Sequence, residues 1–200
     1  MKVVCFFLCL MIISLFYYPV WAQGIEKKGK VELSPLGGMY FKNDIKLKDS
    51  FLIDQKSCYL VGGRVGVYLS SRVALEATFI YSLAKGTILE EDIEKEGNAD
   101  SRSMLYAGNI VYHMGEIDLV PFITFGAGML SFKAPKDSSF PIPGNHLDFN
   151  AGGGVKYFMW ENFAFRADFR IHFIFPRGQA EDVPGFIKAL EFNGGISLSF

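Results

Sequence analysis

The sequence has no long apolar run after residue 22, although 50% of its 200 residues are hydrophobic. A membrane-spanning helix needs about 20 consecutive apolar residues, so we do not expect residues 23–200 to cross a membrane as helices. Charge is also scarce, because 20% of the residues are charged and the formal net charge is −1. Disordered chains are rich in charge and poor in aromatics, and nucleic-acid-binding domains carry a basic patch. The composition therefore excludes both classes, and we expect no nucleic-acid partner.

Cysteine is scarce as well, and two of the three cysteines fall within residues 1–22. This segment combines Lys2, an almost wholly apolar stretch and Val20-Trp21-Ala22, which loosely fits the small-x-small cleavage rule. The pattern is typical of a cleaved secretory signal peptide, with a retained membrane anchor as the alternative. We predict a signal peptide at 1–22 and one exported domain at 23–200. That domain keeps a single thiol, Cys58, so it forms no intramolecular disulfide.

The rest of the chain alternates between apolar and polar residues with a period of two, which is the signature of β-strands. These stretches run about twelve residues, whereas a globular strand averages roughly 5–6 and a strand that crosses a bilayer needs about 9–11. Their length favours membrane-spanning strands. The eight predicted strands are 30–41, 58–69, 72–83, 102–114, 119–132, 146–157, 163–175 and 189–200.

The connections between the predicted strands alternate in length. Short turns fall at 70–71, 115–118 and 160–162, whereas the long links, predicted as loops, are 42–57, 84–101, 133–145 and 176–188. Outer-membrane barrels combine short periplasmic turns with longer external loops. With the N-terminus in the periplasm, the long links are expected to face outward. Because lipid does not tolerate open strand edges, we predict an all-β fold, one closed eight-stranded antiparallel transmembrane β-barrel.

Alternation by itself does not say which face of the sheet points to lipid. A soluble calyx also alternates, with apolar residues inside and charge outside. Here the polar face is mostly Gly, Ala and Ser with isolated charges, which suits the narrow lumen of an eight-stranded barrel. In stretch 163–175 we therefore expect Phe165 and Phe169 to face lipid, and Arg166 and Arg170 to face the lumen. The faces of 102–114 and 119–132 are mixed, so the register of these two strands stays open.

Aromatic residues gather near the ends of the predicted strands, where outer-membrane barrels carry interfacial girdles. Those assigned to the girdles are Tyr40, Phe41, Tyr59, Tyr68, Tyr81, Tyr112, Tyr157 and Trp160.

Three stretches resemble the eight-stranded outer-membrane β-barrel superfamily, the group of the OmpA transmembrane domain, OmpX-like proteins and small porin-family surface proteins. They are PFITFGAGML (121–130), NAGGGVKYFMWENFAFRADFR (150–170) and the terminal ISLSF. The resemblance implies location in the outer membrane of a Gram-negative cell. It implies contact with outer-membrane lipid and lipopolysaccharide. It also implies that Phe200 serves as a signal read by the barrel-assembly machinery. These motifs specify a fold and no particular activity.

Charges on the polar face form the main candidate site. The lumenal charge network is predicted to contain four cations and five anions, with His172 neutral beside them. Because an unpaired buried charge is very costly, we expect these groups to form ion pairs that plug the lumen. A narrow or gated conduit is the alternative. The nine residues are Glu32, Arg64, Glu76, Asp148, Lys156, Arg166, Asp168, Arg170 and Glu191.

No pattern in the sequence favours catalysis or a bound cofactor. Barrel enzymes that deacylate lipid A resemble one another in a His-x-Ser-Asn motif, which none of His113, His146 and His172 matches. These histidines lie on separate predicted strands without metal-ligand spacing. The glycine runs lack the phosphate-loop pattern. We therefore expect no enzyme activity, no cofactor and no metal.

The sequence thus predicts an integral outer-membrane protein with a structural or surface-interaction role. Its lumen is expected to be plugged by ion pairs, and its long loops face outside toward an unknown extracellular ligand. The alternative is a narrow channel or a small hydrophobic-solute carrier that resembles OmpW.

Overall fold

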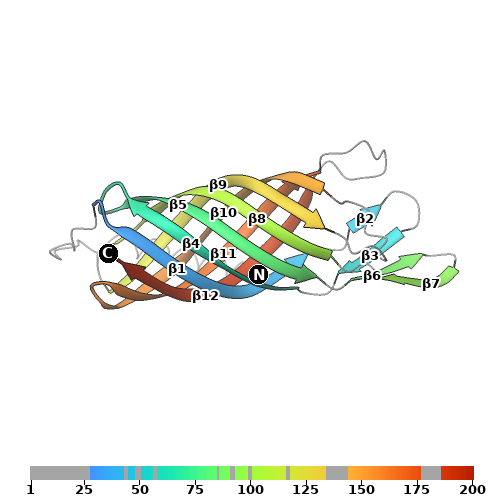
Figure 1. Cartoon of the computed structure of the whole chain (residues 1–200), viewed down its shortest axis with the longest axis horizontal. Coiled ribbons are helices and arrows are strands. Elements are labelled where there is room, and N and C mark those ends of the chain that lie inside the picture. Colours follow the sequence, from blue (N-terminus) through green and yellow to red (C-terminus); the bar gives the residue numbers. More distant parts are fainter. Residues whose placement is uncertain are drawn as a thin grey trace, which may run out of the picture.

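A computed structural model describes residues 28–42, 45–47, 51–55, 58–84, 86–90, 93–98, 101–115, 118–133, 144–176 and 186–200. Within them, eight strands close into an antiparallel barrel in the order β1-β12-β11-β10-β9-β8-β5-β4 (Figure 1). The predicted fold class is therefore confirmed. The predicted signal peptide lies outside the described residues. No helix of the described part is long and apolar enough to cross a membrane.

The barrel strands agree with the eight predicted stretches to within a few residues at each end. The last strand pairs with the first, so the wall closes without a free edge. The strands are β1 (Val31–Lys42), β4 (Cys58–Tyr68), β5 (Val73–Ala84), β8 (Ser101–His113), β9 (Leu119–Lys133), β10 (Gly144–Trp160), β11 (Phe163–Phe175) and β12 (Ile187–Ser199).

The seam between β1 and β12 contains one interruption of its backbone ladder. Leu33 pairs with Leu198 and Leu36 with Gly195, but no pairing forms at Pro35, whose ring nitrogen carries no hydrogen. Inside the lumen, the Ser34 and Ser197 hydroxyls lie 2.7 Å apart at this level. The side-chain hydrogen bond therefore joins the first and last strands where the backbone ladder is broken.

The predicted orientation of the strand faces is confirmed on six of the eight strands. On β11, Phe165 is 49% exposed and Phe169 is 36% exposed, whereas Arg166 is 4% exposed and Arg170 is 1% exposed. The same alternation of exposed bulk and buried polar groups holds on β1, β4, β5, β10 and β12. Bulky apolar groups therefore cover the outside of the barrel, and the nine charged residues of the predicted network point inward.

Strands β8 and β9, whose sequence pattern leaves the register open, send apolar residues to both faces. On β8, Leu105 and Val111 are buried while Ile110 is exposed. On β9, Phe122 is buried while Phe125 is exposed. Pairing with the neighbouring strands fixes these faces, because Ile110 lies opposite Phe125 on the outside.

Two of the long links contain strands, so the prediction that they are loops throughout is wrong. The first link holds β2 (Ile45–Leu47) and β3 (Phe51–Gln55), and the second holds β6 (Gly86–Glu90) and β7 (Ile93–Asn98). They form a four-stranded sheet in the order β2-β3-β6-β7. Figure 1 shows this sheet beyond one end of the barrel. We call this the loop end; the short turns and Phe200 lie at the opposite turn end.

The four-stranded sheet is assembled from two separate links. Its central ladder joins β3 to β6, with Phe51 opposite Glu90 and Gln55 opposite Gly86. Segments about 35 residues apart in the chain meet there because β4 and β5 are neighbours in the barrel and bring their links together. The period-two pattern of these short segments is too brief to separate from that of a loop, so the sequence did not reveal them.

Candidate functional site: the charged lumen

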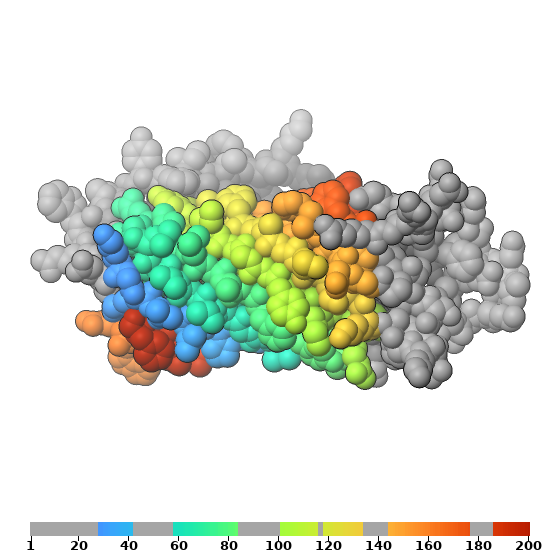
Figure 2. Space-filling view, turned by 45° about the horizontal axis from the view of Figure 1, so that its top comes forward, coloured from blue at the N-terminus to red at the C-terminus, as the bar shows by residue number. Residues whose placement is uncertain are grey.

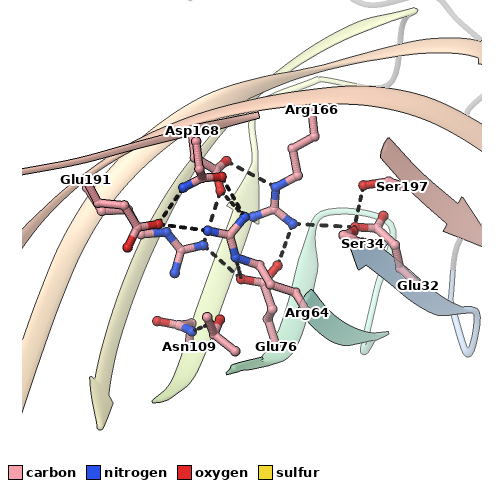
Figure 3. Close-up of polar contacts among 12 residues, drawn as sticks. Glu32, Ser34, Arg64, Glu76, Asn109, Arg166, Asp168, Glu191 and Ser197 are labelled. Carbon is pink, nitrogen blue, oxygen red and sulfur yellow. Dashed lines mark hydrogen bonds and ion pairs between the residues drawn. The ribbon is translucent and has the colours of Figure 1, made fainter. Parts of the chain in front are cut away.

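The structure places all nine residues of the predicted lumenal network inside the barrel, and each is at most 5% exposed. They come from six strands, β1, β4, β5, β10, β11 and β12, and β8 and β9 contribute none of them. Figure 3 shows how the longer side chains converge from different strands on the centre of the lumen.

Glu76 on β5 is the hub of the network. Its Oε2 accepts a hydrogen bond from Arg166 Nη1 at 2.5 Å, and its Oε1 accepts one from Arg170 Nη2 at 2.9 Å. Both arginines lie on β11, the strand diametrically opposite β5 in the closed order. These two contacts therefore cross the full width of the lumen.

Arg64 on β4 links the hub to β11 and β12. Its Nε lies 3.5 Å from Glu76 Oε1, and its Nη1 forms an ion pair with Asp168. Its Nη2 lies 3.2 Å from Glu191 Oε1. Asn193 on β12 also accepts a hydrogen bond from Arg64 Nη1, at 3.1 Å. One guanidinium thus joins three strands across the barrel, which suits its planar fork of donors.

Glu32 and Lys156 extend the network toward the turn end. Lys156 Nζ lies 2.7 Å and 2.8 Å from the two carboxylate oxygens of Glu32. Tyr68 donates a hydrogen bond to Glu32 Oε2 at 2.8 Å. Arg166 Nη1, 3.6 Å from Glu32 Oε1, connects this pair to the hub. The ion pairs therefore form one continuous chain.

His172 extends the network toward the loop end. Its Nδ1 lies 3.1 Å from both carboxylate oxygens of Asp148, and its Nε2 lies 2.9 Å from Glu191 Oε2. A neutral imidazole carries one N–H, so it satisfies one of these carboxylates; an imidazolium satisfies both. With His172 charged, five cations meet five anions. The geometry therefore favours a charged His172, whereas the sequence analysis took it as neutral.

Glycines on β10 leave the room that the long side chains occupy. A Cβ at Gly152 would clash with the Phe169 carbonyl oxygen and lie 2.9 Å from Arg170 Cγ. One at Gly154 would clash with the Ala167 carbonyl oxygen and lie 2.8 Å from Asp168 Oδ1. Both distances are too short for a real side chain without displacement of its neighbour. These glycines are therefore explained by close packing inside the lumen, as expected for glycine within a strand.

Apolar layers cover the network on both sides, which the prediction of a small and polar lumen missed. The layer on the turn side contains Tyr68, Ala74, Val111 and Phe122, with Val120, Phe158 and Ala164 beside it. The layer on the loop side consists of Leu36, Tyr40, Cys58, Leu60, Ile80, Leu105, Ala107, Leu130, Phe132, Ile174, Ile187 and Ala189.

Tyr40 and Tyr68 were assigned to the interfacial girdles, and this assignment is wrong. They are 6% and 2% exposed and point into the lumen. The signal was present in the sequence, because Tyr40 shares the even parity of Glu32 on β1, and Tyr68 shares that of Arg64 on β4. Of the other girdle candidates, Tyr81 is half-buried, and those exposed on the outside are Phe41, Tyr59, Tyr112, Tyr157 and Trp160.

The remaining candidates have simple surroundings. A cavity lined by Tyr40, Ser103, Leu130, His172, Ile174 and Ala189 measures about 10 Å³, about the space that one water needs. Cys58 is buried in the loop-side layer. No cluster of three or more potential metal ligands occurs in the described part of the chain. Phe200 is exposed at the turn end, where its amide bonds the Val31 carbonyl at 2.9 Å.

Comparison with known proteins identifies the architecture. A family model described as outer membrane protein β-barrel domain matches residues 6–200. No curated protein sequence matches the chain.

Several solved structures resemble the barrel at low sequence identity. The outer membrane protein OprG from Pseudomonas aeruginosa aligns with a TM-score of 0.67 and 13% identity, over 87% of this chain and 97% of that one. The outer membrane protein AlkL, determined in lipid bilayers, gives 0.56 and 14%, over 92% and 95%. Neisserial surface protein A gives 0.50 and 10%, over 86% and 98%. At these identities the likeness concerns the fold alone.

Proposed function

Since this chain belongs to the outer membrane protein β-barrel domain family, we propose that it is an integral outer-membrane protein whose lumen is plugged by ion pairs. Its long links then face the outside and carry a structural or surface-interaction role. One observation carries the proposal: Glu76 is held by Arg166 and Arg170 from the opposite wall, at 2.5 Å and 2.9 Å.

The network favours a plug over a conduit because its charges lie in ion pairs with one another. Each of Arg64, Lys156, Arg166 and Arg170 lies within ion-pair distance of at least one carboxylate. Opening a water path requires separation of such pairs, and breaking a buried pair costs about 3–5 kcal/mol. The apolar layers on the loop side and the turn side of the charges are further barriers to the passage of water and ions.

The loop end supports a role at the cell surface. External loops are the longer connections in outer-membrane barrels, and here two of them form the sheet β2-β3-β6-β7 beyond the barrel. An ordered platform of this kind suits contact with an extracellular ligand. The position of these long links at the loop end supports export with that end outward, and cleavage of residues 1–22 is part of the proposal.

Conductance of the purified barrel in planar lipid bilayers tests the plug. We expect no steady single-channel steps from the natural sequence. Steady steps whose size changes in Glu76→Gln or Arg166→Gln would overturn the plug and favour the conduit.

A boiled and an unboiled sample should also migrate differently on a gel, because the closed barrel resists detergent until it is heated. Equal migration would contradict a closed barrel.

A small hydrophobic-solute carrier is the second candidate, and the loop-side apolar layer favours it. Twelve buried residues there form an apolar surface inside the mouth of the barrel. Uptake of an apolar dye into vesicles separates the two candidates. A rate equal to that of protein-free vesicles supports the plug, whereas faster uptake that falls in Phe132→Ser supports the carrier.

We also propose that the protein is not a lipid-modifying enzyme. His172 has both ring nitrogens directed at carboxylates, so neither is available as a base for a serine nucleophile, which needs one within hydrogen-bond reach. Expression of the protein should leave the mass spectrum of lipid A unchanged, and a new deacylated species would contradict this.

A further inference from the structure

His172 on β11 stands between two carboxylates from its neighbouring strands, and one of the two depends on it alone. Its Nδ1 is directed at Asp148 on β10 and its Nε2 at Glu191 on β12. Glu191 also lies 3.2 Å from Arg64 Nη2. For Asp148, which is 0% exposed, His172 is the one cation within ion-pair distance among the described residues. The charge of Asp148 is therefore compensated only while His172 carries its proton.

The other carboxylates of the network have partners of a different kind. Glu32 is paired with Lys156, and Glu76 and Asp168 are paired with arginines. Arginine does not lose its proton in proteins, and lysine titrates near about pH 10, whereas histidine titrates near about pH 6.5. Among the described residues, Asp148 is therefore the one member of the network whose only partner changes charge near neutral pH.

The titratable groups packed around His172 leave this dependence in place. Tyr40 on β1 lies edge-on to the imidazole, with 5.6 Å between the ring centroids, and a neutral phenol supplies no charge. The next inward residue on β11, Arg170, is engaged by Glu76 at 2.9 Å. The buried titratable residues around His172 are Asp148 and His146 on β10, Glu191 on β12, Tyr40 on β1, Cys58 and Arg64 on β4, and Arg170 on β11.

His172 is shielded from bulk water. It is 2% exposed, and the face of the barrel seen in Figure 2 is a closely packed wall. On its loop side lies the cavity of about 10 Å³, whose lining includes Tyr40, Ser103 and His172 itself. The Tyr40 hydroxyl has no hydrogen-bond partner among the described residues. A cavity of this size and lining suits one water molecule in contact with the imidazole.

We propose that the proton on His172 is a pH-dependent latch for the loop-side half of the plug. With the proton present, the imidazolium holds both Asp148 and Glu191. Loss of the proton leaves Asp148 as a buried carboxylate without a cation, which is very costly and favours entry of water beside Tyr40. The ion pairs of Glu76 with arginine keep the rest of the plug closed. The latch rests on the proposed function, because it regulates the same closed lumen.

The latch makes the stability of the barrel fall as the pH rises. In the unfolded chain a histidine loses its proton above about pH 6.5. Above this pH the folded barrel, whose two carboxylates hold the proton on His172, binds one proton more at this site than the unfolded chain does. Stability falls with rising pH wherever the folded state binds more protons.

Asp148→Asn separates this latch from a merely structural histidine. A neutral imidazole with its proton on Nε2 donates to Glu191 and accepts a hydrogen bond from the new amide at Nδ1, so the variant needs no charge on His172. Asp168→Asn is the matched control, because it removes another buried carboxylate of the network whose ion-pair partners are all arginines.

Urea unfolding of the full barrel in phospholipid vesicles, at about pH 6 and about pH 9, measures the effect. We expect the unfolding equilibrium constant of the natural protein to rise at least about tenfold between these values. In Asp148→Asn and in His172→Gln it should change by less than about twofold, whereas Asp168→Asn should be less stable at both values and keep the tenfold rise. Nitrogen NMR of the His172 ring at about pH 7 should show two N–H groups in the natural protein and one in Asp148→Asn.

Three results would overturn the latch: an equal pH dependence in the natural protein and Asp148→Asn, a single N–H on His172 at about pH 6, or loss of the pH dependence in Asp168→Asn. If the variants at His172 and Asp148 fail to fold, the ring spectrum of the natural protein decides. Conductance in planar bilayers is recorded at both pH values. A silent barrel whose stability does not depend on His172 rejects the latch and leaves the plug intact, whereas steady steps at both values reject the plug.

Discussion

The two walls of the lumen differ in chemistry. β11 sends Arg166, Asp168, Arg170 and His172 inward, whereas β8 and β9 send no Asp, Glu, Lys or Arg to the interior along their described lengths. The inward side of β9 instead carries bulky apolar residues toward both ends, such as Phe122 and Phe132, and small residues at its centre, Gly126 and Gly128. Long charged side chains therefore reach into the lumen from the other six strands, which form the charged wall, and β8 and β9 supply space and apolar contact.

This difference shows what each wall contributes to the closed lumen. On the charged wall, each side chain depends on a partner from another strand, so removal of one group affects several strands. On the uncharged wall, apolar side chains pack against their neighbours, and polar contacts such as that of Asn109 with Thr78, at 2.9 Å, reach only the adjacent strand. Thr124 Oγ1 on β9 has no hydrogen-bond partner among the described residues although it is buried.

The largest expected effect comes from Glu76→Gln on the charged wall. Loss of this carboxylate leaves Arg64, Arg166 and Arg170 with an excess of buried positive charge, which we expect to lower the free energy of unfolding by about 3–5 kcal/mol. Urea unfolding in phospholipid vesicles, followed on unboiled gels, measures the change. Thr124→Val on the uncharged wall is the control and should cost less than about 1 kcal/mol. Equal losses in the two variants would remove the distinction between the walls.

An intermediate effect is expected from arginine on the outer face of β9. Phe125 is 59% exposed at mid-strand, so Phe125→Arg should cost about 2–4 kcal/mol at the bilayer midplane. Leu119→Arg, on the same face at the turn end, should cost about 0–1 kcal/mol because it lies near the interface. The same unfolding assay measures both. If Leu119→Arg proved the costlier of the two, Phe125 would not lie near the midplane of the bilayer.

The smallest effect is a coupling energy across the lumen. In a double-mutant cycle, Glu76→Gln and Arg166→Gln should interact by roughly 1–3 kcal/mol, because the two groups are in direct contact. Glu76→Gln combined with Lys30→Gln, a half-buried site at the turn end, should be additive within about 0.5 kcal/mol. Additivity in the first pair would mean that the contact of Glu76 with Arg166 across the lumen contributes nothing of its own.

Sequence reasoning succeeded where the lumen is charged and failed where it is apolar. On β11 an arginine or aspartate alternates with phenylalanine, so the two faces differ in polarity and the orientation follows. On β8 and β9 both faces carry apolar residues, such as Phe122 inside and Phe125 outside, and alternation holds no information. The two apolar layers were also missed, because no strand contributes more than two residues to either layer.

The sequence by itself determined the number and lengths of the barrel strands, the closed fold and the inward direction of the nine charges. These follow from periodicity and side-chain size, which act along a single strand. Only the tertiary structure decided which charges meet, because Glu76 and Arg166 lie on opposite sides of the lumen and are 90 residues apart in the chain. It also decided the register of β8 and β9, the inward position of Tyr40 and Tyr68, and the sheet β2-β3-β6-β7. Each of these depends on which strands become neighbours once the barrel closes.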